Sequence, residues 1–172
     1  VWSVMAWFKP ANISTADDII FIRELVGIEN RIVLQILSGE WRISFRDSSA
    51  TLIKSYVTTN TPITAAARNM ILATWDGTTL LMYKNGTVID VGDINKSTDN
   101  AGSQTATNRK VAIGGAANFF EGLVSTYAIW SVALDAASVS SLYNGGTGFG
   151  VDLRTSFGGY SATATLQHYW AL

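Results

Sequence analysis

Short segments in which apolar and polar residues alternate run through most of the chain. In residues 41–46 the apolar side chains fall on one side of an extended backbone and the polar ones on the other: Trp41, Ile43 and Phe45 against Arg42, Ser44 and Arg46. This period of two is typical of a half-buried β-strand. Comparable segments predict further strands at residues 2–9, 18–26, 31–37, 51–58, 70–75, 80–84, 87–91, 110–114, 123–130 and 166–171.

Two dipeptides predict tight turns between three of these strands. Asp76-Gly77 follows the segment at 70–75, and Asn85-Gly86 follows the one at 80–84. A type I′ hairpin turn needs positive φ at both central residues, which Asn, Asp and Gly tolerate best. The spacing therefore predicts a three-stranded antiparallel meander, and Ser38-Gly39 predicts a similar turn after residues 31–37.

One segment breaks the strand pattern and predicts a short helix. Asp135 can cap the first turn through its carboxylate, and Leu134 and Val139 have the spacing of a hydrophobic staple. Gly145 suits the left-handed position that follows a helix. The polar residues 93–108 predict a long surface loop, and residues 145–164 predict a second irregular stretch.

Antiparallel strands joined by short turns, without alternating helices, predict an all-β sandwich or barrel. We expect residues 1–172 to form one domain, because this length suits a single core. We also expect the sequence to be a piece of a longer chain, since both ends fall within predicted strands. Six aromatic residues sit at inward positions and predict the core: Trp7, Trp41, Phe45, Trp75, Tyr83 and Trp130.

The composition excludes several classes of function. Twelve basic and thirteen acidic residues give a net charge of −1, which argues against non-specific nucleic-acid binding and a polybasic membrane patch. No apolar run approaches the roughly 18 residues of a membrane span. The absence of cysteine excludes disulfides and thiolate metal sites, and a single histidine excludes a three-histidine zinc site.

Several motifs, in series, resemble the laminin G-like, concanavalin A-like lectin and glucanase superfamily. They are SVMAWFKP at 3–10, ATWDG at 73–77, LMYKNG at 81–86, IGG at 113–115, FEGLVSTYAIW at 120–130, the helix at 133–143 and YWAL at 169–172. The resemblance implies an antiparallel two-sheet β-sandwich, a jelly roll, with one short helix near 135–144. The closing run, residues 142–170, is similar to such domains in phage virion structural proteins and bacterial surface proteins. It implies an extracellular or virion-surface location.

The resemblance to glucanases raises the question of catalysis. Glycoside hydrolysis needs two carboxylates flanking the scissile bond, which these relatives supply as Glu-x-Asp-x-x-Glu on one strand. None of the four glutamates, Glu24, Glu29, Glu40 and Glu121, lies in that motif. A Ser-His-Asp triad would depend on His168, which lies in an apolar closing strand. We therefore expect no enzymatic activity.

Calcium is the one cofactor that the resemblance implies, because many relatives bind it at the sandwich rim. The candidate ligands are Asp17 and Asp18, adjacent in sequence, and Asp90 and Asp93. The alternative is that these carboxylates cap backbone N–H groups in turns. In this chain Ser125-Thr126 replaces the Asp-Glu pair that many relatives carry after Gly-x-(Ile/Val).

Glycan binding would use aromatic rings on which pyranose faces stack. Phe119, Phe149 and Tyr160 lie in loop-like sequence and are the candidate ligand-binding residues. We expect a non-catalytic recognition or adhesion module, displayed on a virion or extracellular surface, whose partner is a glycan or cell-surface receptor. The alternative is a structural virion decoration or fibre domain that packs against other subunits through an exposed apolar patch or strand edge.

Overall fold

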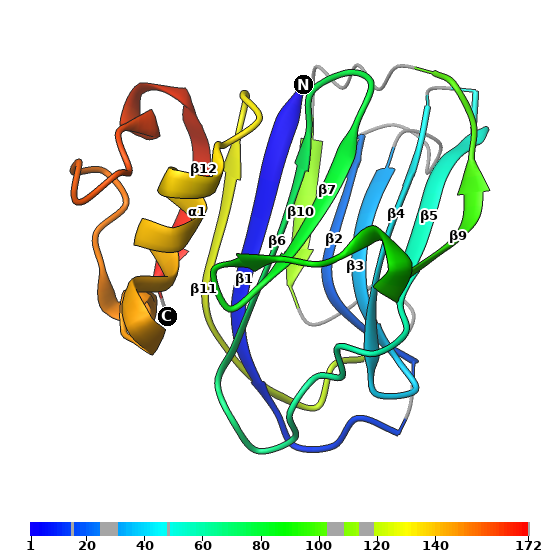
Figure 1. Ribbon diagram of the computed structural model, residues 1–172, viewed down its shortest axis with the longest axis horizontal. Coiled ribbons are helices and arrows are strands. Elements are labelled where there is room, and N and C mark those ends of the chain that lie inside the picture. The colour runs from blue at the N-terminus through cyan, green and yellow to red at the C-terminus, as the bar shows by residue number, and fades with distance from the viewer. Residues whose placement is uncertain (15, 25–30, 48, 103–108, 114–118, 172) are drawn as a thin grey trace. The chain divides into compact units, whose positions relative to one another are not determined.

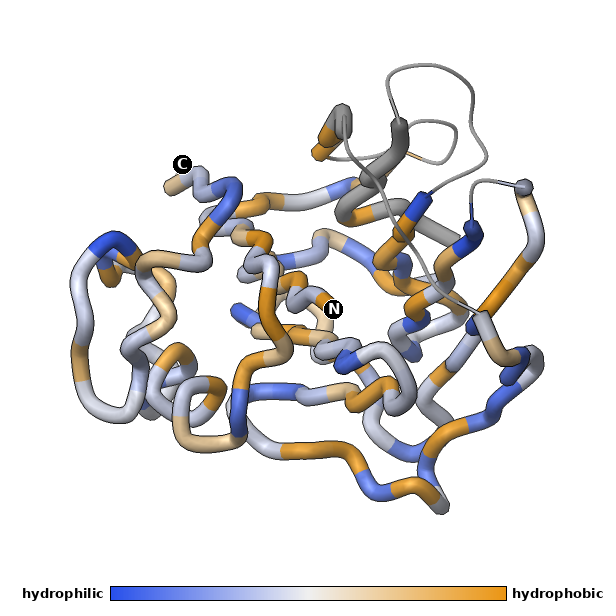
Figure 2. The backbone as a smooth tube through the Cα atoms, turned by 90° about the horizontal axis from the view of Figure 1, so that it is seen from above, coloured by the Kyte–Doolittle hydropathy of each residue, from blue (hydrophilic) through white to orange (hydrophobic). Residues whose placement is uncertain are grey.

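The structure is a computed structural model that describes residues 1–14, 16–24, 31–47, 49–102, 109–113 and 119–171. Within these ranges the chain forms two antiparallel sheets of six strands each and one short α-helix (Figure 1). The alternation of hydrophobic and hydrophilic residues that predicted the strands is visible along the backbone in Figure 2. No helix in the described part is long and apolar enough to cross a membrane.

The first sheet belongs to a unit made of residues 1–9, 67–89 and 123–172. Its strands lie in the order β12-β11-β1-β6-β7-β8. Their bounds are β1 (Trp2–Pro10), β6 (Asn69–Trp75), β7 (Leu80–Lys84), β8 (Thr87–Val88), β11 (Gly122–Trp130) and β12 (Leu166–Ala171). The predicted meander is therefore confirmed as β6-β7-β8, although β8 is only two residues long.

The second sheet belongs to a unit made of residues 10–66 and 90–122. Its order is β10-β2-β3-β4-β5-β9. The bounds are β2 (Ala16–Glu24), β3 (Arg31–Leu37), β4 (Glu40–Arg46), β5 (Leu52–Thr58), β9 (Ile94–Asp99) and β10 (Arg109–Ile113). In β3 and β4 the apolar residues meet in register on one face and are buried: Ile32 with Phe45, Leu34 with Ile43, and Ile36 with Trp41.

The polar loop predicted at residues 93–108 is wrong in its first part, because Ile94–Asp99 form β9 and pair with β5. The strand is hard to recognise because it lies at a sheet edge, where Asn95, Lys96 and Ser97 are exposed. Polar and charged side chains suit an edge, since they discourage pairing with another chain. Residues 103–108 of the predicted loop lie outside the described residues.

The two hairpin turns differ from each other. Asn85 and Gly86 have φ of 50° and 82°, as a type I′ turn requires. A side chain at Gly86 would also meet Cβ of Tyr143 at 2.8 Å, so the helix packs against the bare backbone there. Asp76 does not have positive φ; its Oδ1 instead accepts hydrogen bonds from the N–H groups of Thr78 and Thr79, both at 2.7 Å. The prediction of a type I′ turn at Asp76-Gly77 is therefore wrong.

The helix α1 (Ala136–Tyr143) begins and ends close to the predicted positions. Oδ1 of Asp135 accepts a hydrogen bond from the N–H of Ser138 at 2.7 Å, and the left-handed residue after the helix is Asn144, followed by Gly145. In the first unit, α1 and the C-terminal segment contribute to one apolar cluster with the sheet (Figure 1). Its members are Met5, Trp7, Met70, Leu72, Tyr83, Ala128, Trp130, Leu134, Val139, Leu142, Leu153 and Tyr160.

Candidate functional site

The two predicted calcium ligands whose side chains are described, Asp90 and Asp93, each accept a hydrogen bond. Oδ1 of Asp90 accepts from the N–H of Gly92 at 2.7 Å, at the start of the 3-10 turn η1 (Val91–Asp93). Oδ1 of Asp93 accepts from Nδ2 of Asn60 at 2.8 Å. Asp17 and Asp18 lie in β2, and their side chains fall outside what is described. Among the described residues, no group of three or more acidic or histidine side chains could hold a metal ion.

The three predicted ligand-binding aromatics have very different surroundings. Phe119 is 76% exposed. Phe149 is half-buried, with its ring edge-to-face against Trp7 at a centroid distance of 5.9 Å and Cζ of Arg68 4.0 Å from its centroid. Tyr160 is only 1% exposed, so the expectation of an accessible ring there is corrected. Its hydroxyl is also engaged, since it accepts from Trp130 and donates to Leu153.

The most exposed tryptophan lies on β12. The other five tryptophans are at most 2% exposed, whereas Trp170 is 55% exposed. It pairs in register with the buried Tyr127 of β11, and the two rings stack with centroids 6.5 Å apart and an interplanar angle of 13°. The buried Tyr127 supports the exposed ring and restricts its orientation. Burial also raises the pKa of the Tyr127 hydroxyl above its usual value.

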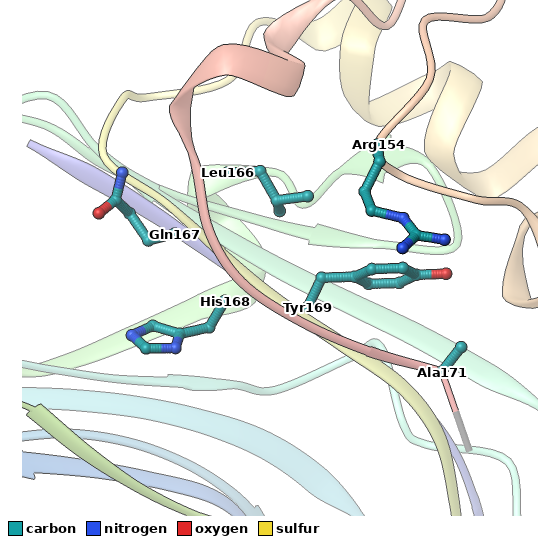
Figure 3. A pocket seen from close by; sticks show the side chains of 6 residues that line it. All are labelled: Arg154, Leu166, Gln167, His168, Tyr169 and Ala171. Carbon is teal, nitrogen blue, oxygen red and sulfur yellow. The ribbon is translucent and has the colours of Figure 1, made fainter.

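A shallow pocket runs along the same strand (Figure 3). It is lined by Arg154, Leu166, Gln167, His168, Tyr169 and Ala171. The guanidinium of Arg154 lies over the ring of Tyr169, whereas Gln167 and His168 point away from these two side chains. A register shift between Ile129 and Trp130 of β11 interrupts the alternation of β12 near Gln167.

The polar groups of this pocket are held in place by short-range contacts. Nε and Nη2 of Arg154 donate to the two carboxylate oxygens of Asp152, at 2.9 and 3.0 Å. This pairing lowers the pKa of the Asp152 carboxyl. The hydroxyl of Tyr169 donates to the carbonyl of Val151 at 3.1 Å, which fixes the ring under the guanidinium.

Successive residues of a strand point to opposite faces, so Trp170 shares a face with His168, whereas Tyr169 and the Arg154 above it lie on the other face. We call Trp170, His168 and the neighbouring Gln167 the β12 surface. It combines one exposed indole ring with two planar polar groups, a carboxamide and an imidazole. An indole offers a flat apolar face, and planar polar groups offer directional hydrogen bonds. This arrangement suits a ligand with an apolar face and a rim of hydroxyls, as a pyranose has.

Sequence analysis did not single out Trp170 as a ligand-binding residue. The run HYW at 168–170 looks like an apolar closing strand, and nothing in the sequence distinguishes Trp170 from the five buried tryptophans. The distinguishing fact is that β12 is an edge strand, which depends on the strand order. His168 is exposed and lies opposite Ile129 in register.

The chain belongs to the concanavalin A-like lectin/glucanases superfamily, whose model matches residues 1–140. None of the curated proteins compared with this sequence matches it. The match and the strand arrangement of the two sheets confirm the predicted class, an all-β antiparallel jelly roll with one short helix in the described residues.

Solved structures with the same fold are only distantly related in sequence. The SAP-like pentraxin from Limulus polyphemus has a TM-score of 0.60 and 16% identity, over 83% of this chain and 69% of the other. Domain 4 of the arabinanase AbnA from Geobacillus stearothermophilus has a TM-score of 0.60 and 21% identity, over 83% of this chain and 66% of the other. The CBM40 domain of a Ruminococcus gnavus sialidase has a TM-score of 0.64 and 12% identity, over 83% of this chain and 82% of the other.

Proposed function

We propose that this chain is a non-catalytic glycan-binding module and that a sugar binds at the β12 surface. The observation that carries the proposal is Trp170, which is 55% exposed and stacked on the buried Tyr127. A ligand or partner that covers this ring would remove its apolar surface from water, which favours binding there. The Tyr127 ring stacked behind the indole and the polar side chains beside it favour a carbohydrate over a purely apolar ligand.

Two of the similar structures support this class of ligand. Domain 4 of the arabinanase is described in complex with arabinotriose, and the CBM40 domain is bound to α2,3-sialyllactose. We infer the same class of partner for this chain, a glycan or a glycan-bearing receptor, without assigning a particular sugar. The proposal also takes residues 1–172 as one binding domain displayed outside the cell or on a virion, where surface glycans occur.

A glycan array probed with the wild-type chain and with Trp170→Ala tests the proposal. We expect the wild type to bind and the variant to lose at least about tenfold in affinity, as loss of a stacked aromatic ring does. The matched control is Leu123→Ala, which removes an exposed apolar side chain from β11. Equal binding by wild type and Trp170→Ala would contradict the site, and no binding to any glycan would contradict the function.

The same array with calcium and with EDTA tests the predicted cofactor. If Asp17, Asp18, Asp90 and Asp93 hold a calcium ion that the ligand requires, EDTA abolishes binding. The carboxylate of Asp90 accepts from the N–H of Gly92 in its own turn, and that of Asp93 accepts from Nδ2 of Asn60. These bonds favour a role in holding the turn and the neighbouring loop, so we expect binding to persist in EDTA.

A structural role is the second candidate, and the free edge of β12 favours it. Among the described strands β12 pairs only with β11, and its other edge is the one that a second chain would use. In this reading the chain decorates a virion or fibre by packing against other subunits. Light scattering at increasing protein concentration tests it: a stable oligomer that Trp170→Ala dissociates favours the structural role, and a monomer favours glycan binding.

A further inference from the structure

Two exposed cations lie side by side at one end of the first sheet. The register of β1 and β6 ends at the residues next to Lys9 and Arg68, so these two lie opposite each other. The two segments stay together beyond this point, because the N–H of Ala66 donates to the carbonyl of Pro10 at 2.9 Å. Residues opposite each other in antiparallel strands have Cβ atoms about 5 Å apart. We call Lys9 and Arg68 the cation pair.

Both side chains lie on the face of the sheet that packs against α1. Trp7 and Met70, two residues away along the same segments, are buried in the apolar cluster to which α1 contributes. Side chains two residues apart in a strand share a face. The position of Arg68 confirms this, since its guanidinium lies over the ring of Phe149, with Cζ 4.0 Å from the centroid. The cation pair is therefore at the exposed end of this face.

The ring next to the Arg68 guanidinium is itself held by several contacts. Phe149 packs edge-to-face against the buried Trp7, whose ring stacks on that of Tyr143 with centroids 5.7 Å apart and an interplanar angle of 8°. The carbonyl of Phe149 accepts a hydrogen bond from Oγ1 of Thr126 at 2.8 Å. A guanidinium over an aromatic ring keeps the N–H donors at its edge available. Arg68 therefore loses less conformational freedom on binding a ligand than a side chain in open solvent does.

Neither member of the cation pair has an anionic partner among the described residues. The ion pairs there join Lys54 and Lys96 to Asp99, and Arg154 to Asp152. Arg154 is also an exposed arginine of the first unit, but both carboxylate oxygens of Asp152 occupy its guanidinium. The cation pair differs from it in having its charge uncompensated.

The acidic residues of the first unit are engaged elsewhere. The unit contains three of them, Asp76, Asp135 and Asp152, against four lysines and arginines. Asp76 follows the far end of β6, where its carboxylate accepts from the N–H groups of Thr78 and Thr79. Asp135 caps α1. Because like charges opposite each other destabilise an antiparallel pair, the cation pair costs stability in the free protein.

We propose that the cation pair binds an oxyanion, the carboxylate or sulfate group of an acidic glycan. Arg68 donates two parallel N–H bonds to this group through its planar guanidinium, and Lys9 adds a second positive charge beside it. That a sugar carries the oxyanion rests on the proposed function. A nucleic acid is disfavoured, since two cations are few for a phosphate backbone and the chain is slightly acidic overall.

The cation pair is a separate site from the β12 surface. Trp170 lies opposite Tyr127 in register, and the next residue of β11, Ala128, belongs to the apolar cluster. Successive residues of a strand point to opposite faces, so Trp170 and the cation pair lie on opposite faces of the first sheet. A variant in one site therefore leaves the contacts of the other unchanged.

Titration calorimetry with two matched pairs of polymers tests the proposal. The first pair is polygalacturonate and its fully methyl-esterified form, and the second is dextran sulfate and dextran. We expect the charged member to bind more tightly than the neutral one and to lose this advantage as salt is added. Preference in the first pair alone assigns a carboxylate, preference in the second alone assigns a sulfate, and preference in both assigns either group.

Three variants locate the site. Arg68→Gln should weaken binding of the charged polymer about tenfold, as loss of a charge-assisted hydrogen bond does. Lys9→Gln should weaken it about threefold, because an exposed point charge contributes less. The matched control, Arg154→Gln, removes the same charge from an exposed guanidinium that Asp152 already occupies, and it should leave the affinity within about twofold.

The melting temperature separates binding from a structural role. Lys9 has no partner among the described residues, so Lys9→Gln should lower the affinity for the charged polymer without lowering the melting temperature of the free protein. A lysine with a merely structural role would lower the melting temperature and leave the affinity unchanged.

Three results would overturn the proposal. They are equal affinity for the charged and neutral members of both pairs, unchanged affinity in Arg68→Gln and Lys9→Gln, and tighter binding of polyglutamate than of either acidic polysaccharide. The last result would assign the site to an acidic peptide. None of them bears on the β12 surface, which Trp170→Ala tests on neutral glycans, so failure of one proposal is distinguishable from failure of the other.

Discussion

The indole Nε1 of Trp130 donates a hydrogen bond to the hydroxyl of Tyr160 at 3.0 Å, with both side chains buried. The same hydroxyl donates to the carbonyl of Leu153 at 2.9 Å. These two bonds connect β11 to a C-terminal segment that contains only short 3-10 turns between α1 and β12. The irregular residues before β12, including Arg154 of the pocket, are therefore anchored to the core of the first unit.

Tyr160→Phe should destabilise the protein by about 1–3 kcal/mol, because it leaves the buried Nε1 of Trp130 and carbonyl of Leu153 without a partner. Chemical denaturation followed by far-UV circular dichroism measures the change. Tyr169→Phe is the matched control: its hydroxyl bonds the carbonyl of Val151 and is only half-buried, so the loss should be smaller. A larger loss in the control would contradict the anchoring role of Tyr160.

Asp99 is held in its ionised form by a half-buried cluster on the second sheet. Nζ of the buried Lys54 donates to its carboxylate, and the hydroxyl of Tyr56 donates to the same oxygen at 2.8 Å. The Lys54 ammonium, followed by the Tyr56 hydroxyl, lowers the pKa of Asp99 below its usual value. Burial, with the Asp99 carboxylate, raises the pKa of Tyr56.

Asp99→Asn should therefore cost about 1–2 kcal/mol near neutral pH, a modest figure because the carboxylate is 44% exposed. A lowered carboxyl pKa gives stability that is complete above the unfolded value of about 3.9 and is lost as pH falls through the folded value. Unfolding free energies measured between pH 2 and 6 should fall less steeply in the variant. Asp152→Asn, on an exposed pair, should change stability less. Parallel pH profiles for wild type and Asp99→Asn would contradict this account.

The cap of α1 gives a third prediction. The N–H of Ser138 lowers the pKa of Asp135 by donating to its carboxylate. Asp135→Ala should cost about 1 kcal/mol, as loss of an N-cap does, and Asp135→Ser should recover most of it. Thermal unfolding monitored by circular dichroism compares the three proteins. If the serine variant is no more stable than the alanine one, the cap is not what stabilises this end of the helix.

Phe149 and Phe119, two of the three predicted ligand-binding aromatics, should differ in how much their replacement by alanine destabilises the protein. Phe149→Ala should destabilise the first unit, because its ring packs against Trp7 and beneath Arg68. Phe119→Ala removes a side chain that is 76% exposed and should leave the melting temperature within about 1 °C. Differential scanning fluorimetry measures both. A loss of glycan binding in Phe119→Ala at unchanged stability would instead place the ligand near that loop.

The local patterns were enough to predict the strands, the helix cap and the aromatic core. The alternation in Trp41–Arg46 and the Asp135 cap each involve only a few neighbouring residues, so both can be recognised in the sequence before the fold is known. The strand β9 was missed because an edge strand lacks the apolar face that marks a strand in sequence. The exposure of Tyr160 was misjudged and Trp170 was overlooked for a related reason: whether an aromatic ring is buried depends on which strand lies at the edge and what covers it.

Iodide quenching of tryptophan fluorescence tests the central claim most directly, because Trp170 is the only one of the six tryptophans more than 2% exposed. The account predicts that iodide quenches one accessible component, that Trp170→Phe lacks this component, and that a bound glycan protects it. A glycan that binds the wild-type chain without changing the quenching would contradict a sugar site at Trp170.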